Sequence, residues 1–155
     1  MLPEFPVEGG CQCGSVRYRL TRRPHAVYRC HCTDCRKFSG AAYGISMPAD
    51  RDSVELLRGE PAVYRKQAAS GRVVEMFYCP TCLTRLWNHP QGNDSLTVLR
   101  AGTLDNADWA VPVGNIWTQS KVSWIDIDPD EPHFEGQPPS RELLYGAWQN
   151  KVGAA

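Results

Sequence analysis

The cysteines of this 155-residue chain lie in three tight groups and constrain its chemistry more than any other feature. The groups are Cys11-Gln12-Cys13, Cys30-His31-Cys32 with Cys35 shortly after, and Cys79-Pro80-Thr81-Cys82. Clustered thiolates are ligands that zinc prefers. Structural zinc is held by four protein ligands, whereas catalytic zinc usually has three and one open position. Seven cysteines therefore favour one closed zinc site and one site with a free position.

Three other uses of the cysteines fit less well. A disulfide framework conflicts with the odd count and with an N-terminus, Met1 to Pro6, that lacks the basic segment and apolar run of a secretory signal. We therefore expect a reducing, cytoplasmic location, where clustered cysteines are more often metal ligands or redox groups. A thioredoxin-like pair at Cys79 and Cys82 lacks the flanking strand–helix–strand pattern. An iron–sulfur cluster ranks below zinc.

The spacing of the cysteines also indicates how they converge. In an extended strand, residues two apart point to one face, so Cys11 would align with Cys13 and Cys30 with Cys32. The residue between them points the other way, and we expect His31 to face away from the metal. Because Zn–S bonds are only about 2.3 Å long, four sulfurs must come from more than one segment. Pairing a C-x-C strand with a C-x-x-C turn would achieve this, and both C-x-x-C units are expected on tight turns.

Composition and charge indicate one ordinary globular domain. Apolar residues make up 42% of the chain and charged residues 22%. No segment approaches the roughly 20 apolar residues of a membrane span. Lys+Arg and Asp+Glu both number 17, so the basic excess of a nucleic-acid-binding protein is missing. We interpret the local group of arginines as the solvent face of an amphipathic strand; its members are Arg17, Arg19, Arg22 and Arg23.

Short β-strands dominate the pattern of apolar and polar residues. They are separated by Gly, Pro, Asp and Ser, which is typical of a mainly β, mostly antiparallel fold. The expected strands are 16–20, 26–30, 41–47, 53–57, 62–65, 72–78, 96–101 and 121–127. The proline-rich stretch 128–139 is expected to form an extended strap. Residues 141–149 are expected to form a short helix capped by Ser140.

From about residue 9 to 125 the chain resembles the glutathione-dependent formaldehyde-activating enzyme (GFA) family, also called the centromere protein V domain family. The resemblance rests on the three cysteine motifs in order, with their flanks, and on two stretches downstream. The matching segments are Gly10 to Tyr18, Cys30 to Lys37, Phe77 to Cys82, Ala101 to Asp105 and Ile116 to Lys121. The resemblance implies twisted antiparallel sheets of the β-tent type, built around zinc–cysteine knuckles. It implies a single domain over 1–155, with a motif-bearing core at about 9–127 and a strap and short helix over 128–155.

The resemblance also implies two zinc ions and an activity. The structural zinc would be held by Cys11, Cys13, Cys79 and Cys82. The second zinc, with an open fourth position, would be held by Cys30, Cys32 and Cys35, which are thereby the catalytic candidates. No organic cofactor is expected. The implied activity is that of a carbon–sulfur lyase acting on the adduct of glutathione, or a similar thiol, with a small aldehyde. Candidate substrate contacts are Arg36, Lys37 and Trp117.

Two residues depart from the family pattern. Leu83 stands where the family usually has glycine, so the backbone shape of the Cys79–Cys82 knuckle is expected to differ while its metal ligands are kept. Asn115 lies where many relatives carry histidine. If that histidine serves catalysis, the replacement alters or removes the activity. Two other functions stay open: a non-catalytic, zinc-stabilised module that binds protein or nucleic acid, and a thiol sensor that releases zinc on oxidation. Nothing in the sequence indicates the oligomeric state.

Overall fold

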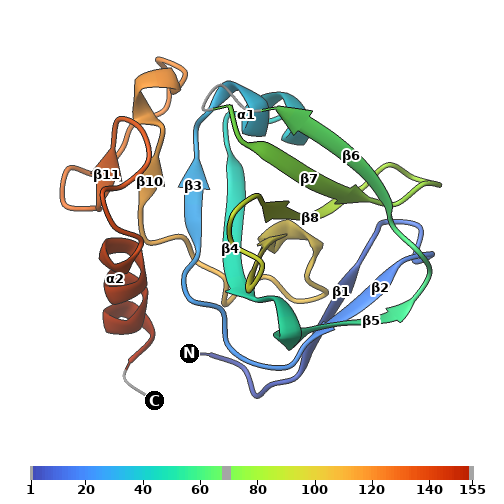
Figure 1. The fold of residues 1–155 in the computed structure, drawn as a ribbon. Helices are drawn as coiled ribbons and strands as arrows, with labels where there is room; N and C mark the ends of the chain where they lie inside the picture. The colour runs from blue at the N-terminus through green and yellow to red at the C-terminus, as the bar shows by residue number, and fades with distance from the viewer. Residues whose placement is uncertain (1, 68–70, 154–155) are drawn as a thin grey trace.

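The computed structural model describes residues 2–67 and 71–153, and within them the chain forms two β-sheets (Figure 1). The smaller sheet has the order β1-β2-β5, with strands β1 (Val7–Gly10), β2 (Arg17–Leu20) and β5 (Val54–Arg58). The larger sheet has the order β11-β10-β3-β4-β9-β8-β7-β6. Its strands are β3 (Tyr28–Cys30), β4 (Gly44–Asp50), β6 (Ala62–Gln67), β7 (Val73–Tyr78), β8 (Arg85–Pro90), β9 (Leu96–Arg100), β10 (Asn115–Ile116) and β11 (His133–Phe134).

Helices are few and short in the described residues. They are α1 (Thr33–Ser39), α2 (Glu142–Val152) and the 3-10 turns η1 (Arg51–Ser53), η2 (Ala101–Thr103) and η3 (Thr118–Ser120). Among these residues no helix has the length and apolar character to cross a membrane. The N-cap residue of α2 is Arg141 and not the expected Ser140, although the Ser140 hydroxyl accepts a hydrogen bond from the Glu142 N–H at 3.2 Å. The prediction of a mainly β fold with a short C-terminal helix is confirmed.

Several elements differ from the sequence expectations. Residues 121–127 form no strand: their alternation has no neighbouring strand to pair with, and Trp124 is 71% exposed. Strands β1 and β8 were not expected, nor was the pairing of β10, which lies parallel to both β3 and β11. The β10–β3 register sets Ile116 beside Cys30. The larger sheet is therefore mixed, although most of its pairs are antiparallel.

One apolar core joins both sheets and the C-terminal helix. Tyr18 comes from the smaller sheet, Met47 and Leu99 from the larger sheet, and Leu144 and Trp148 from α2; all are at most 2% exposed. Figure 1 shows α2 beside the β10–β11 edge of the larger sheet. This helix thus completes the core at the end of the chain, and its stability should come from packing more than from helix propensity.

The docking of α2 predicts a contrast between two tryptophans. Trp148→Ala should lower the free energy of unfolding by about 3–5 kcal/mol, because it removes a fully buried side chain. Trp124→Ala is the control, and should change stability by less than about 0.5 kcal/mol since this indole is exposed. Urea denaturation followed by circular dichroism measures both. Similar losses in the two variants would contradict this packing.

Candidate functional site

Four cysteines from two distant segments form the first cluster. Cys11 and Cys13 lie in the turn between β1 and β2, while Cys79 and Cys82 lie in the turn between β7 and β8. Their sulfurs are all within 4.8 Å of one another. The Cys11–Cys13 separation is 3.5 Å and the Cys13–Cys79 separation is 3.7 Å. The first C-x-C unit therefore converges from a turn, and not from the extended strand that its spacing suggested.

These distances fit a metal site better than a disulfide. Sulfurs at the corners of a tetrahedron around zinc would be about 3.8 Å apart, from a Zn–S bond of about 2.3 Å. A disulfide would need about 2.05 Å, and all seven cysteines are free. Ionised thiols repel one another, so a bound cation would stabilise a compact group of four. The cluster can hold a metal ion, and its soft sulfur donors suit zinc.

The Cys79–Cys82 turn of the four-cysteine cluster is a hydrogen-bonded knuckle even though Leu83 follows it in place of glycine. The Leu83 N–H donates to the Cys79 carbonyl at 2.9 Å, and the Cys79 N–H donates to the Thr84 carbonyl at 2.9 Å. Leu83 has a φ of 62°, in the left-handed region that favours glycine, and its side chain is 70% exposed. The Thr84 hydroxyl, 3.2 Å from the Cys82 sulfur, and the Thr84 N–H lower the pKa of Cys82 to about 5. The turn thus stabilises a thiolate, at some cost in backbone strain.

Because of this backbone strain, we expect a substitution by glycine to stabilise the protein. Leu83→Gly should raise the free energy of unfolding by about 0.5–1 kcal/mol, because glycine adopts this φ without steric penalty. Leu143→Gly is the matched control: Leu143 is also exposed, but it lies in α2, where glycine should cost about 1 kcal/mol. Thermal or urea unfolding of the metal-loaded proteins measures the difference. A loss of stability in both variants would contradict the strained knuckle.

Three more cysteines form the second cluster where β3 meets α1. Cys30 ends β3, Cys32 caps α1 and Cys35 lies in its first turn. The Cys30 and Cys32 sulfurs are 3.5 Å apart, and the Cys35 N–H donates to the Cys32 sulfur at 3.3 Å. The expectation of a tight turn is wrong for this C-x-x-C unit, because Cys32 itself supplies the capping acceptor of a helix. All three sulfurs are within 4.8 Å of one another.

The second cluster contains no fourth ligand among the described residues. No further His, Cys, Asp or Glu in that part of the chain brings a ligand atom into the group. His31, between Cys30 and Cys32, is fully buried on the other side of the strand, with its Nε2 2.9 Å from the Asn115 Oδ1. The prediction that His31 faces away is confirmed. This cluster can also hold a metal ion, with room for a ligand from outside.

Asn115 ties this region to the C-terminal strap. Its amide nitrogen donates to the Glu131 Oε2 at 3.0 Å, so its oxygen faces His31 as an acceptor. Glu131 also accepts from Arg29 at 2.8 Å. The chain thus buries Asn115 in a structural network, and the pocket described next is not lined by it.

A pocket of about 440 Å³ connects the two clusters. It is bordered by Cys35 of the three-cysteine cluster and by Cys82 of the four-cysteine cluster. Apolar walls come from Phe38, Tyr43 and Leu83. The remaining lining residues are Ser39, Gly44, Ile45, Thr84, Arg85, Arg100, Gly102 and Thr103.

Two arginines that sequence reasoning missed lie in this pocket. Arg100 ends β9 and its Nη1 is 3.8 Å from the Cys35 sulfur. Gly44 permits this approach, because a Cβ there would be 3.1 Å from the Arg100 Nη1 and 3.3 Å from the Cys35 Cβ. Hydrogen bonds from Cys30 and Cys32, and then the charges of Arg100 and Arg85, lower the pKa of Cys35. Only the order of the strands in the sheet brings these arginines to Cys35, so no local motif could have identified them as neighbours of that cysteine.

The substrate contacts expected from sequence lie near the second cluster but outside the pocket lining. Arg36 and Lys37 follow Cys35 on α1, where Arg36 is partly buried and Lys37 exposed. Trp117 follows β10 with a left-handed φ of 59°, and its N–H donates to the Gly136 carbonyl at 3.1 Å. Their contact with a substrate stays a prediction.

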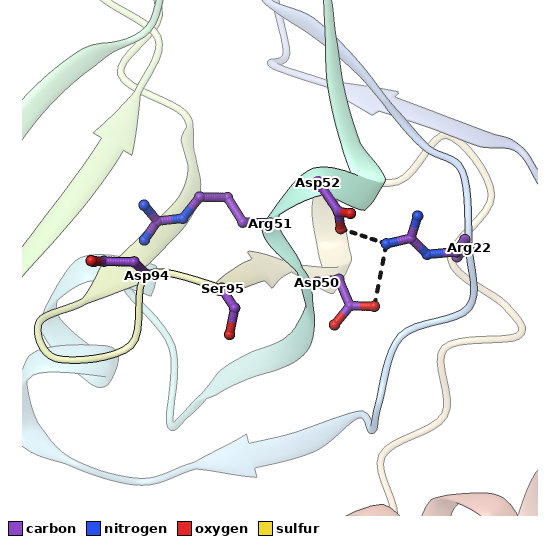
Figure 2. Close-up of a pocket in the computed structure, with 6 residues that line it drawn as sticks. All are labelled: Arg22, Asp50, Arg51, Asp52, Asp94 and Ser95. Atoms are coloured by element: carbon purple, nitrogen blue, oxygen red, sulfur yellow. Dashed lines mark hydrogen bonds and ion pairs between the residues drawn. The ribbon is translucent and has the colours of Figure 1, made fainter.

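A second depression, of about 570 Å³, lies at the other end of β4 from Cys35 (Figure 2). Arg22 reaches both Asp50 and Asp52, and the lining is completed by Arg51, Asp94 and Ser95. Two of the three carboxylates in this depression are thus paired with the Arg22 guanidinium, and no cysteine lines it. The pocket between the cysteine clusters is therefore the candidate functional site.

Comparison with known proteins identifies the family. The sequence model of the family "Glutathione-dependent formaldehyde-activating enzyme" matches residues 6–120, and the chain belongs to this family. A Halomonas elongata protein named "Putative glutathione-dependent formaldehyde-activating enzyme" is 28% identical over 155 aligned residues, which cover 95% of this chain and 96% of that protein. A crystal structure of a Rhodobacter sphaeroides protein matches with a TM-score of 0.50 at 16% identity. It covers 82% of this chain and 98% of the other, and this likeness concerns the fold.

Proposed function

We propose that this protein is a zinc-dependent enzyme of the carbon–sulfur lyase type, acting on adducts of glutathione or a similar thiol with a small aldehyde. The observation that carries the proposal is a three-cysteine cluster that lacks a fourth ligand in the described residues and opens, through Cys35, on a pocket. Family membership and the name of the Halomonas elongata relative support the thiol and the aldehyde as substrates.

The two clusters would divide the work. In this proposal the four-cysteine cluster holds a structural zinc, because four thiolates complete the coordination of that ion. Its ligands would be Cys11, Cys13, Cys79 and Cys82. The three-cysteine cluster would hold the second zinc, with Cys30, Cys32 and Cys35 as ligands. A zinc ion there would supply Lewis acidity and would stabilise a thiolate.

The reaction needs no oxidant or reductant. In the lyase direction the carbon–sulfur bond of the adduct breaks, the adduct hydroxyl loses its proton as the carbonyl forms, and the sulfur leaves as a thiolate that takes up a proton. Phe38, Tyr43 and Leu83 would enclose the adduct and limit its contact with water. Arg85 and Arg100 would add positive potential where the negative sulfur develops. The same groups serve the reverse addition.

The alternative of a nucleic-acid-binding module gains little from the structure. Three of the four arginines considered for a basic patch pair with carboxylates: Arg17 with Glu8 and Asp105, Arg19 with Glu8, and Arg22 with Asp50 and Asp52. A patch neutralised in this way offers little charge to a phosphate backbone.

Two cysteine variants test the division of work. Cys11→Ser should abolish cooperative folding, since structural zinc contributes roughly 10–16 kcal/mol in model peptides and a domain is stable by only about 5–15 kcal/mol. Cys32→Ser should leave a folded protein, because serine can still cap α1, but should remove one zinc and the activity. Metal content by mass spectrometry, circular dichroism and an assay of S-hydroxymethylglutathione cleavage measure these effects.

The contradicting outcomes are distinct. Equal unfolding of both variants would show that the clusters do not have separate roles. A Cys32→Ser protein that keeps both its zinc content and its cleavage rate would remove the three-cysteine cluster from the reaction.

A further inference from the structure

Two guanidinium groups that are at least partly buried lie beside the three-cysteine cluster, with no carboxylate of the described residues to balance them. Arg100 is 9% exposed and Arg85 is half-buried. Within the described residues neither comes within 4.0 Å of an Asp or Glu oxygen. Arg29 and Arg65 do have such partners, whereas the partly buried Arg36 and Arg51 have none among the same residues. What distinguishes Arg85 and Arg100 is that both line the pocket beside Cys35.

Neutral groups hold the pair in place. The Asn88 Oδ1 accepts from Arg85 at 2.7 Å and from Arg100 at 3.1 Å. Arg100 also donates to the Ser46 hydroxyl at 3.1 Å. The Nε of each arginine is buried without a hydrogen-bond acceptor among the described residues. Burial, and next the charge of Arg100, lower the pKa of Arg85 to about 10. Two like charges are thus kept together in a partly desolvated place.

Such an arrangement calls for negative charge nearby. Buried charges persist in proteins when opposite charges balance them, and the nearest candidate here is the sulfur of Cys35. Three thiolates around a divalent cation carry one net negative charge, which balances one guanidinium and leaves the other. An anion bound in the pocket would balance the second.

We propose that Arg85 and Arg100 make the open position of the three-cysteine site selective for an anionic ligand, a thiolate, over a neutral one. This inference rests on the proposed function, because it requires a divalent cation held by Cys30, Cys32 and Cys35. A thiol binds there as thiolate and its proton passes to solvent; no bond to carbon changes in this step. The two guanidinium groups attract the negative sulfur of the ligand itself. The selectivity therefore does not depend on whether the thiol also carries carboxylates.

The test compares two small probes on the zinc-loaded protein by isothermal titration calorimetry. 2-Mercaptoethanol binds as an anion and has no carboxylate, whereas imidazole binds as a neutral ligand. Arg85→Gln keeps a donor for Asn88 but removes the charge. We expect it to weaken 2-mercaptoethanol binding at least tenfold, because at an effective dielectric constant of about 20 a single charge contributes about 1.4 kcal/mol even from about 12 Å away. Imidazole binding should stay within about twofold of the wild type.

Three further variants make the test independent of one substitution. Arg85→Lys keeps the charge and should bind both probes like the wild type. Asn88→Asp places a carboxylate on both guanidinium groups and should weaken 2-mercaptoethanol binding as Arg85→Gln does. Arg65→Gln is the matched control, since Arg65 pairs with Glu75 on the exposed edge of the larger sheet, and should change neither probe. Zinc content is measured for every protein before titration.

Each other outcome overturns the inference. Equal weakening of both probes means that Arg85 supports the site without selecting charge. No weakening of either probe means that its charge does not reach the ligand. Glutathione is titrated as a further probe, and if Arg85→Gln weakens its binding but not that of 2-mercaptoethanol, Arg85 interacts with a carboxylate. A wild type that carries no metal at the three-cysteine cluster contradicts the proposed function itself, and is distinguished from these outcomes by its zinc content.

Discussion

The convergence of seven sulfurs into two compact groups is the constraint on which the rest of this structure depends. Separations of 3.5–3.7 Å between neighbouring sulfurs are too long for disulfides and too short for unscreened thiolates. The first group joins the turn after β1, which leads into the smaller sheet, to the turn between β7 and β8 of the larger sheet. A cation at this point would act as a cross-link between the two sheets. The second group joins the end of β3 to the start of α1.

The two clusters are linked through the polypeptide itself. Arg85 follows Cys82 by three residues, so the knuckle that would hold the structural metal also sets the start of β8 and the place of this guanidinium. Leu83, in the strained position of the same knuckle, forms a wall of the pocket. On the other side, the register of β4 and β9 brings Arg100 beside Ser46, and Gly44 leaves room for Arg100 to approach Cys35. The four-cysteine cluster therefore positions groups that line the pocket beside the three-cysteine cluster.

The cysteine count predicted two groups, the alternation of apolar and polar residues predicted a mainly β fold, and the spacing of Cys30 and Cys32 predicted the direction of His31. These features depend on local rules: ligand spacing, strand alternation and turn residues. Which cysteines share a group came from the family resemblance. The helix at Thr33–Ser39 was not predicted, because its cap is a cysteine thiol that the sequence pattern assigned to metal binding alone. Residues 121–127 have strand-like alternation but no partner strand. Arg85 and Arg100 could not be found from sequence, since only the order of β4, β9 and β8 in the larger sheet brings them together near Cys35.

The most direct test of two metals held by sulfur is X-ray absorption at the zinc K-edge on the purified protein. One closed site with four sulfurs and one open site with three should give an average of about 3.5 sulfur ligands per zinc. Addition of 2-mercaptoethanol should raise this average toward about 4, because the open position would take a thiolate. A protein without zinc, or one whose average stays unchanged when the thiol is added, would contradict the division into a closed and an open site.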